Sequence, residues 1–410
     1  MPELFTVVPP DEALKRLFSH IRPGVGTQNV KVNLALGRIT AEDTFAPADL
    51  PAFSRSTMDG YAVKAADTYG ASEAIPAYLK VVGEIPMGKP AGLTLRRGQV
   101  AKVHTGGMLA EGADAVVMVE NTQVVDETTI EVVRPVAPGE NVLHVGDDVK
   151  KGHLLLSARH LLRPQDIGGL MGLGITEIAV SSRPRVAILS TGDELVPPDG
   201  EVTPGKVRDI NTYSLSALTL QAGAIPLSFG LVGDSYDELR EAAVRGMEQA
   251  DMLVISAGSS VSTRDLTAQV ISSLGKPGVL VHGVSIRPGK PTILASVEGK
   301  PAIGLPGNPV SALVIFDLFV VPTIYRLAGC TTPPLRPSVE ARLTHNLASV
   351  TGREDYVPVK LETNPEGLLA VPIFGESNLI STMMRADGMA RVPLDKGGLS
   401  AGETVTVRLF

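Results

Sequence analysis

Tryptophan is absent from this 410-residue chain, and only 4% of its residues are aromatic. Single-stranded nucleic acids are usually held by aromatic side chains on which the bases stack. The formal net charge is −7 and no long run of Lys and Arg occurs, which disfavours nucleic acids and anionic membrane surfaces, because both attract positive charge. We therefore expect no nucleic-acid partner and no membrane partner.

Cysteine is almost absent as well. Cys330 is the only one, so no disulfide can form within the chain, and its place in a linker region favours an inert thiol over a nucleophile. The first residues lack a basic segment followed by an apolar core, and no unbroken apolar run reaches the length that spans a bilayer. These features predict a cytoplasmic localisation.

Several common catalytic motifs are missing too. The seven histidines are scattered, without an HExxH motif or paired Cys and His spacing, so a zinc site is not expected. The Walker A pattern, the GxGxxG fingerprint and the nucleophile elbow of hydrolases are also absent, which leaves covalent acyl transfer unsupported. If a metal takes part, the acidic loops described below suit magnesium, which prefers oxygen ligands.

What the chain does contain is enough apolar sequence for several cores. Hydrophobic residues make up 44% and charged residues 20%, as in globular proteins, and 410 residues are too many for one ordinary core. Uneven spacing of 42 glycines and 31 prolines marks the borders. We expect a split linker domain at 1–46 and 141–182, an inserted β-rich module at 47–140, an α/β domain at 183–330, and a C-terminal β-barrel domain at 331–410.

The α/β domain has the clearest pattern. Apolar strands alternate with helices; we expect the strands at 185–190, 225–230, 252–256 and 301–305, and the helices at 213–222, 236–249, 265–274 and 310–327. This alternation predicts a parallel, doubly wound sheet with helices on both faces. In such a sheet the carboxyl ends of the strands lie at one edge, so the loops after them converge on one crevice.

Four loops of this domain carry groups that suit an anion. They are loop one (Ser190–Leu195), loop two (Ser256–Asp265), loop three (Ile286–Pro291) and loop four (Gly304–Ser311). Small residues let backbone N–H groups close around a phosphate, and loop three holds two cations on a Pro-Gly turn. Taken alone, each loop is explained about as well by a purely structural role. In the order of the loops, these roles are a turn with solvated acids, close packing of a helix on the sheet, an exposed basic turn and a helix cap.

Together the four loops favour a ligand that carries a nucleotide or a phosphate. Four carboxylates are available for a metal ion: Asp193, Glu194, Asp234 and Asp265. Two further loops, Ser54–Ala62 and His144–Val149, place carboxylates at domain junctions, where clefts form. Either of these two loops alone is explained by solvated acids.

Ordered motifs run through nearly the whole length of the chain. Ser56–Ala62 is similar to S-x-MDGYA, and Thr105–Gly107 with Glu111–Val117 is similar to TGA-x-x-PEGADAVV. Further matching segments are Ser190–Leu195, Ile286–Pro291, Leu305–Ser311 and Ser381–Arg391. In these motifs the chain resembles the molybdopterin molybdotransferase family, which also includes the C-terminal domain of gephyrin. The resemblance implies a multidomain α/β fold with the four domains above, in a homodimer whose site is shared between subunits.

The resemblance also implies an activity. A transferase of this family inserts molybdate into adenylylated molybdopterin, with magnesium-dependent release of AMP, and a molybdopterin adenylyltransferase is the expected upstream partner. Carried over by motif, the catalytic residues would be Asp59, Thr105, Asp148, Glu194, Asp234 and Asp265. The substrate-binding residues would be Thr191, Gly192, Gly258, Ser259, Ser260, Arg287, Lys290, Gly307, Asn308 and Ser377. Our chemical assignment gives magnesium to Glu194 and Asp265, and the oxyanion or phosphate to Arg287 and Lys290.

The chain departs from the family pattern at several positions. Ala257, Ser259 and Ser262 change an SGGVSVG-like loop, Arg287 stands where lysine is frequent, and Gly375–Asn378 replaces a glycine-rich turn. A tungstate-preferring homologue is therefore an alternative. The preceding adenylyl transfer is another, which the presence of three further domains disfavours. A non-catalytic molybdopterin-binding scaffold is the third, and the retained acids and cations disfavour it.

Overall fold

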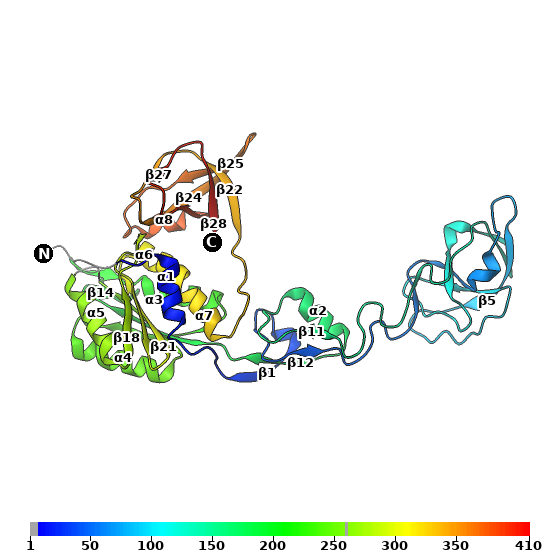
Figure 1. Ribbon diagram of the computed structural model, residues 1–410, viewed down its shortest axis with the longest axis horizontal. Helices are drawn as coiled ribbons and strands as arrows, with labels where there is room; N and C mark the ends of the chain where they lie inside the picture. The colour runs from blue at the N-terminus through cyan, green and yellow to red at the C-terminus, as the bar shows by residue number, and fades with distance from the viewer. Residues whose placement is uncertain (1–6, 259–260) are drawn as a thin grey trace. The chain divides into compact units, whose positions relative to one another are not determined.

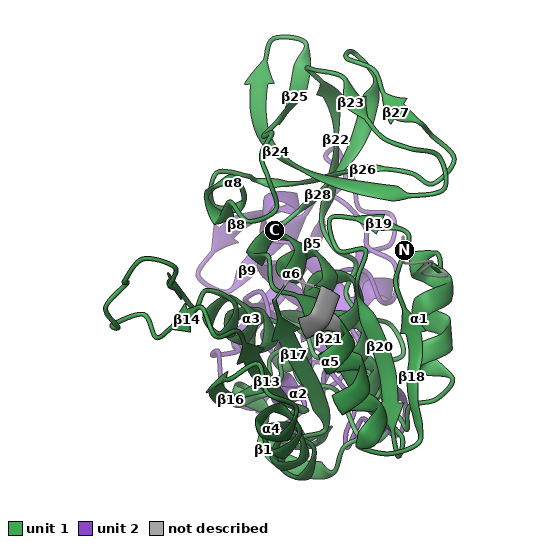
Figure 2. Ribbon diagram, turned by 90° about the vertical axis from the view of Figure 1, so that its left-hand side faces the viewer, with its two compact units in different colours: residues 1–42, 158–167, 176–410 green, residues 43–157, 168–175 purple. Residues whose placement is uncertain are grey.

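The computed structural model describes residues 7–258 and 261–410, and the side chains of all of these except residues 261–264. By its internal contacts the chain divides into two units, which Figure 2 draws in different colours. Unit 1 consists of Met1–Glu42, Ala158–Ile167 and Thr176–Phe410, and unit 2 of Asp43–Ser157 and Gly168–Ile175. The limits of the four domains expected from the sequence stay a prediction.

The centre of unit 1 is a six-stranded sheet that includes β18 and β21 (Figure 1), and its strand order is β16-β13-β17-β21-β20-β18 (Figure 2). Its strands are β13 (Arg185–Thr191), β16 (Ile225–Val232), β17 (Met252–Ala257), β18 (Pro277–His282), β20 (Ile293–Val297) and β21 (Lys300–Pro306). The first four in this order are parallel, as expected, whereas β20 and β18 are antiparallel to their neighbours. The antiparallel pair differs from the expected sheet because Glu298 and Gly299, both with positive φ, form a two-residue hairpin turn between β20 and β21.

Helices cover both faces of this sheet. Helices α1 (Pro10–Phe18), α3 (Asn211–Gln221), α6 (Pro309–Ile315) and α7 (Val321–Leu327) pack on one face, and α4 (Tyr236–Gln249) and α5 (Val261–Ser273) on the other. Successive residues of β13 alternate between the two cores, with Ile188 in the first and Leu189 in the second. The doubly wound α/β fold is confirmed.

The stretch from α6 to α7 differs from the single helix expected at 310–327. A π-helical turn, η4 (Phe316–Val320), separates the two helices, and it precedes Pro322, which has no N–H for a regular helical bond. By length and apolar composition alone, Pro309–Leu327 could cross a membrane, although Asp317 interrupts the apolar run. Because 67% of it is buried within the protein, it has the character of a core helix.

The C-terminal part of unit 1 is a small β-barrel. Its strands are β22 (Ser338–Leu343), β24 (Glu354–Asn364), β25 (Gly367–Pro372), β26 (Gly388–Val392) and β28 (Thr404–Leu409). They close into a ring of five because β24 pairs with both β25 and β26. Strand β19 (Ile286–Arg287) adds to β24, so loop three of the α/β sheet lies against the barrel. The predicted C-terminal barrel is confirmed.

Unit 2 contains the inserted β-rich module. Its sheet has the order β7-β4-β6-β5-β9-β8, with β4 (Gly60–Val63), β5 (Ala77–Glu84), β6 (Gln99–Val103), β7 (Ala115–Met118), β8 (Thr122–Asp126) and β9 (Thr129–Val132). Apolar clusters cover both faces of β4, since Tyr61 belongs to one and Ala62 to the other. A Cβ at Gly60 would lie 1.9 Å from the carbonyl oxygen of Val117, so only glycine allows β7 to approach this closely.

Two short strand pairs join the segments that lie before and after the module in the sequence, as expected for the split linker, and a third pair joins the module to the second of these segments. In unit 1, β1 (Thr27–Lys31) pairs with β12 (Glu177–Ser181). In unit 2, β2 (Thr44–Phe45) pairs with β11 (Leu154–Leu156), and β3 (Arg55–Ser56) with β10 (Val142–Leu143). The remaining elements are η1 (Val32–Leu34), η2 (Ala65–Thr68), η3 (Val119–Asn121), α2 (Pro164–Gly172), β14 (Leu195–Val196), β15 (Val207–Arg208), β23 (Leu347–Ala348), β27 (Gly398–Leu399) and α8 (Ile380–Met384).

Candidate active site

The carboxyl ends of the four parallel strands in unit 1 form one row. The register pairs Val232 with Thr191, Thr191 with Ala257, and Ala257 with Pro306. The loops that follow these four residues therefore start side by side at one edge of the sheet. Loop three reaches the same edge, because β20 starts at Ile293, which pairs with Gly304 near the end of β21.

Loop one meets the loop between β16 and α4. The Thr191 hydroxyl donates to Oδ1 of Asp234 at 2.6 Å, and Oδ1 of Asp193 accepts from the backbone N–H of Asp234 at 3.1 Å. Gly233, just before Asp234, lies under the carboxylate of Glu238, since a Cβ there would be 2.5 Å from its Oε2. The expected residues Thr191 and Asp234 are thus in direct contact.

Glu194 folds back over Gly192. A Cβ at Gly192 would lie 2.7 Å from Oε2 of Glu194, so the glycine leaves room for this exposed carboxylate. Asp265 lies in α5 and is also exposed. Within residues 7–258 and 261–410, no group of three or more His, Cys, Asp and Glu side chains is placed to hold a metal ion. Any magnesium bound here would therefore take further oxygen ligands from substrate or water.

Loops two and four touch at the middle of the row. A Cβ at Gly307 would lie 2.7 Å from the carbonyl oxygen of Ala257 and 3.1 Å from Cα of Gly258. The side-chain amide of Asn211, at the start of α3, ties them together by donating to Oγ of Ser256 at 2.7 Å and to the carbonyl of Gly307 at 2.8 Å. Ser259 and Ser260, also expected in loop two, lie outside the described residues.

Loop four also contacts the C-terminal barrel. Asn308 precedes α6, as expected of a capping residue, but its side chain makes no capping bond. Its amide donates instead to Oγ of Ser377 at 2.9 Å, and the N–H of Val310 donates to the carbonyl of Ser377 at 3.1 Å. Two residues expected in the site, 69 positions apart in the sequence, are therefore bonded to each other.

Loop three is held by a buried carboxylate of the barrel. Nη1 of Arg287 lies 3.9 Å from Oδ2 of Asp355, whose carboxylate also accepts from Nε and Nη2 of Arg353 at 2.7 and 2.9 Å. Asp355 is 3% exposed, whereas Arg287 and Lys290 are exposed at the sheet edge. One carboxylate between two guanidinium groups leaves one positive charge in this group of three side chains, which suits an anionic ligand.

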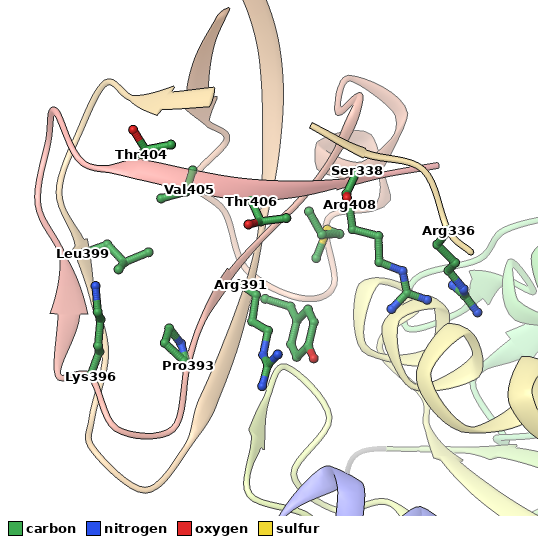
Figure 3. Close-up of a pocket in the computed structure, with 12 residues that line it drawn as sticks. Arg336, Ser338, Arg391, Pro393, Lys396, Leu399, Thr404, Val405, Thr406 and Arg408 are labelled. Atoms are coloured by element: carbon green, nitrogen blue, oxygen red, sulfur yellow. The ribbon is translucent and has the colours of Figure 1, made fainter. Parts of the chain in front are cut away.

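On the other side of β24, Glu354 is also buried, and it binds two residues, Arg391 and Tyr356, that line a separate pocket in unit 1 (Figure 3). It accepts from Nη2 of Arg391 at 2.5 Å and from the Tyr356 hydroxyl at 2.8 Å. Burial raises the pKa of Tyr356, and Glu354 raises it further. The pocket has about 650 Å³. Its other cations are paired with carboxylates: Arg336 and Arg408 with Asp317, and Lys396 with Glu403. None of the expected site residues lines it.

The remaining expected residues lie in unit 2. The exposed carboxylate of Asp59 accepts from the backbone N–H of Thr105 at 2.8 Å and from its hydroxyl at 3.2 Å, both at Oδ1. The backbone bond from Thr105 lowers the pKa of Asp59, and the Thr105 hydroxyl and His104 lower it further against the effect of burial. Asp148 is exposed in the loop after β10, where its N–H donates to the carbonyl of Leu50.

Sequence reasoning missed three residues that contact the expected site residues and loops, each within its own unit. Asn211, Asp355 and His104 each contact an expected residue or loop from a distant segment of the chain. A partial signal existed for Asp355, because two adjacent carboxylates at the start of an apolar strand need buried partners. Nothing comparable in the sequence marked Asn211 or His104.

Three family models match the chain. They are the MoeA N-terminal region (domain I and II) over residues 8–174, a "probable molybdopterin binding domain" over 187–326, and the MoeA C-terminal region (domain IV) over 340–410. The fold and these matches define a multidomain protein with a molybdopterin-binding-type α/β domain between two MoeA regions. The chain belongs to the MoeA family of molybdopterin molybdenumtransferases.

Curated relatives and solved structures agree with this assignment. The chain is 32% identical over 402 residues to the molybdopterin molybdenumtransferase of Haemophilus influenzae, covering 98% of each chain. It is 33% identical over 414 residues to that of Bacillus subtilis, covering 100% of this chain and 96% of the relative. A crystal structure of the molybdopterin biosynthesis MoeA protein from Pyrococcus horikoshii matches with a TM-score of 0.86 and 32% identity, covering 99% of this chain and 100% of that one.

Proposed function

We propose that this chain inserts molybdate into adenylylated molybdopterin and releases AMP with the help of magnesium. The coarser function, molybdenum transfer to molybdopterin in molybdenum cofactor biosynthesis, follows from membership of the family. One observation supports the finer proposal above others: Thr191, Val232, Ala257 and Pro306 end their strands in one row. Hydroxyls, backbone N–H groups and carboxylates therefore gather at one edge, as a phosphate-bearing substrate requires.

The substrate would lie along this edge, bound by groups from several loops. Thr191, Gly192, Gly258, Gly307, Asn308 and Ser377 are the described residues that we assign to it, and Ser259 and Ser260 enter through the resemblance alone. The contact of Gly307 with Ala257 and the bond between Asn308 and Ser377 support this assignment, because they hold loops two and four and the barrel in one place. A pre-formed edge of this kind loses little entropy when a ligand binds.

Release of AMP breaks the phosphoanhydride by addition of one water, whose oxygen bonds to phosphorus as the bridging P–O bond breaks, and negative charge develops on the departing phosphate. Arg287 and Lys290 are exposed cations at the edge, and Nη1 of Arg287 lies 3.9 Å from the buried carboxylate of Asp355. We assign them to the oxyanion or phosphate, where fixed positive charge stabilises the charge that develops as the bond breaks. Asp234, which accepts from Thr191, would orient the Thr191 hydroxyl within the same edge.

Glu194 and Asp265 are our assignment for magnesium. Both are exposed carboxylates, and Gly192 leaves room for the first of them. Oxygen-only donors fit magnesium, which in phosphate sites is commonly held by one or two carboxylates together with substrate phosphates and water. When bound, the ion would neutralise charge on the phosphoanhydride oxygens. The two carboxylates themselves would fix where that charge is neutralised.

The proposed function also includes the oligomeric state of the protein, its upstream partner and its cellular compartment. We infer a homodimer in which Asp59, Thr105 and Asp148 of one subunit serve the site of the partner. The bonds from Thr105 that fix the Asp59 carboxylate support its use as an oriented anionic group. A molybdopterin adenylyltransferase would supply the adenylylated substrate, and both would work in the cytoplasm, since the chain has a single cysteine and no paired thiols.

The test is AMP release from adenylylated molybdopterin by the purified protein with magnesium, in the presence and absence of molybdate or tungstate. We expect release that depends on the oxyanion and leaves the metal on the dithiolene. Faster turnover with tungstate would identify a tungstate-preferring enzyme. Tight binding without AMP release under any of these conditions would contradict the transferase proposal and favour a molybdopterin-binding scaffold.

A further inference from the structure

A series of charged side chains in unit 2 lies beside Asp59 and has no role in the function proposed so far. His104 is at its centre. Its Nε2 lies 2.8 Å from Oε1 of Glu84, and its Nδ1 lies 3.7 Å from Oδ1 of Asp59. Nζ of Lys102 lies 3.8 Å from the other carboxylate oxygen of Glu84. The imidazole of His104 therefore lies between two carboxylates.

The sheet of unit 2 brings these residues together. Strands β5 and β6 are parallel neighbours whose register pairs Glu84 with Lys102, and His104 follows Lys102 by two residues, the spacing that returns to one face of a strand. Asp59 immediately precedes Gly60, which pairs with Val103 of β6. The three groups thus lie in or directly beside the ends of three adjacent strands, and the pairing of these strands brings them close together.

The bond to Glu84 determines what the other ring nitrogen of His104 presents to Asp59. A carboxylate only accepts hydrogen bonds, so Nε2 must carry the proton that it donates to Glu84. In a neutral ring Nδ1 is then an acceptor, and its lone pair faces the Asp59 oxygen. In a charged ring Nδ1 carries a proton as well, and the ring attracts both carboxylates.

His104 lowers the pKa of both carboxylates. The hydrogen bond from His104 lowers the pKa of Glu84, and Lys102 lowers it further. The pKa of Asp59 is lowered first by the backbone bond from Thr105, with His104 contributing in the same direction. Side-chain exposure is 40% for His104 and 64% for Asp59, so solvent screens this interaction and its effect should be moderate.

We propose that His104 is a positioning residue for Asp59: in its charged form it bridges Glu84 and Asp59 and holds the Asp59 carboxylate in the orientation that the transfer reaction uses. This inference rests on the proposed function, in which Asp59 is catalytic. Only the charged ring carries a proton on both nitrogens, so loss of the proton on Nδ1 removes the hold on Asp59. The charged groups that face the ring are Asp59 before β4, Glu84 at the end of β5, and Lys102 on β6, near Glu84.

The first test measures the coupling without any substrate. The ring resonances of His104, assigned with a His104→Gln variant, are followed by NMR as a function of pH in the full-length protein. We expect Asp59→Asn and Glu84→Gln each to shift the midpoint of the His104 titration to lower pH, because each removes a negative charge that favours the charged ring. An unchanged midpoint in Asp59→Asn would overturn the inference whatever the activity of the protein.

The second test is the pH profile of AMP release. Glutamine at position 104 can still donate to Glu84 but cannot become charged, so His104→Gln should lower kcat/KM by up to about fivefold at pH 6 and leave it unchanged at pH 8.5. His153→Gln, at an exposed histidine of the same unit, is the matched control and should follow the wild-type profile. A His104→Gln profile parallel to that of the wild type at every pH would overturn the positioning role.

The two tests separate the inference from the function on which it rests. A wild-type protein that releases no AMP, with the His104 titration still responding to Asp59→Asn, would contradict the proposed function and leave the bridge intact. AMP release that requires Asp59, with no response of the His104 titration, would contradict the bridge and leave the proposed function intact.

Discussion

Replacing Asp166 by asparagine should lower the stability of unit 1 at neutral pH. Asp166 is 8% exposed, and its carboxylate accepts from the backbone N–H of Arg163 at 2.8 Å, from Nε and Nη2 of the same residue at 3.0 Å each, and from Nε2 of His160 at 2.7 Å. Burial raises the pKa of this carboxyl, but the bonds from Arg163 and His160 outweigh burial and bring the pKa to about 2.

The size of the effect follows from that value. Lowering the pKa from 3.8 to about 2 corresponds to about 2.4 kcal/mol of stability from the ionised carboxylate. Because the folded-state pKa lies below the unfolded value, this contribution is present above about pH 4 and is lost as pH falls through 2, with roughly half remaining at pH 3. An asparagine side chain at this position could not carry the charge or accept from all of these donors, so the loss at pH 7 should be about 2 kcal/mol, or about 4 °C in Tm for a unit of this size.

Differential scanning calorimetry is the suitable assay, since the chain has no tryptophan to report unfolding by fluorescence. Wild type and Asp166→Asn are compared at pH 7 and pH 3, together with Asp199→Asn, which changes an exposed aspartate between β14 and β15. The Tm difference between wild type and Asp166→Asn should shrink at the lower pH, and Asp199→Asn should follow the wild type. Equal Tm values for wild type and Asp166→Asn at pH 7, or a difference that stays constant down to pH 3, would refute the reasoning.

Three further predictions concern the site. Asp59→Asn should abolish AMP release while Tm changes by less than about 1 °C, because Asp59 is exposed on a loop; full activity would remove it from the mechanism. Gly307→Ala should lower Tm and weaken substrate binding, since its methyl group would lie 2.7 Å from the Ala257 carbonyl oxygen. The control is Gly172→Ala, whose methyl group would have no atom within 4 Å, and equal Tm and binding of the two variants would show that loops two and four do not touch. Analytical ultracentrifugation should find two chains per particle, and a clean monomer would argue against a shared site.

The sequence predicted best those helices and strands whose own residues show the full hydrophobic pattern of the element. Helix α4 has the bounds expected for it, Tyr236–Gln249, and Ser235 caps it; β17 starts where its apolar run was expected to start and is buried along its whole length. Strands β18 and β20 were missed, since their antiparallel pairing depends on a turn and on β21 rather than on their own period. Motif loops could be placed after strands, but the side chains that brace them come from segments remote in the sequence, which only tertiary packing brings near.

The C-terminal barrel is better understood as part of the site than as an appendage to it. Its strand β24 carries two adjacent buried carboxylates, and because successive residues of a strand point to opposite faces, Asp355 meets Arg287 while Glu354 meets Arg391. Its loop before α8 supplies Ser377, which bonds to Asn308 at the end of the α/β sheet. Two separate contacts therefore fix loops three and four against the barrel. Removal of the barrel would take away the partner of Arg287 in loop three and the partner of Asn308 in loop four. Loss of the barrel should therefore impair the anion-binding edge, even though no strand of the central sheet is removed.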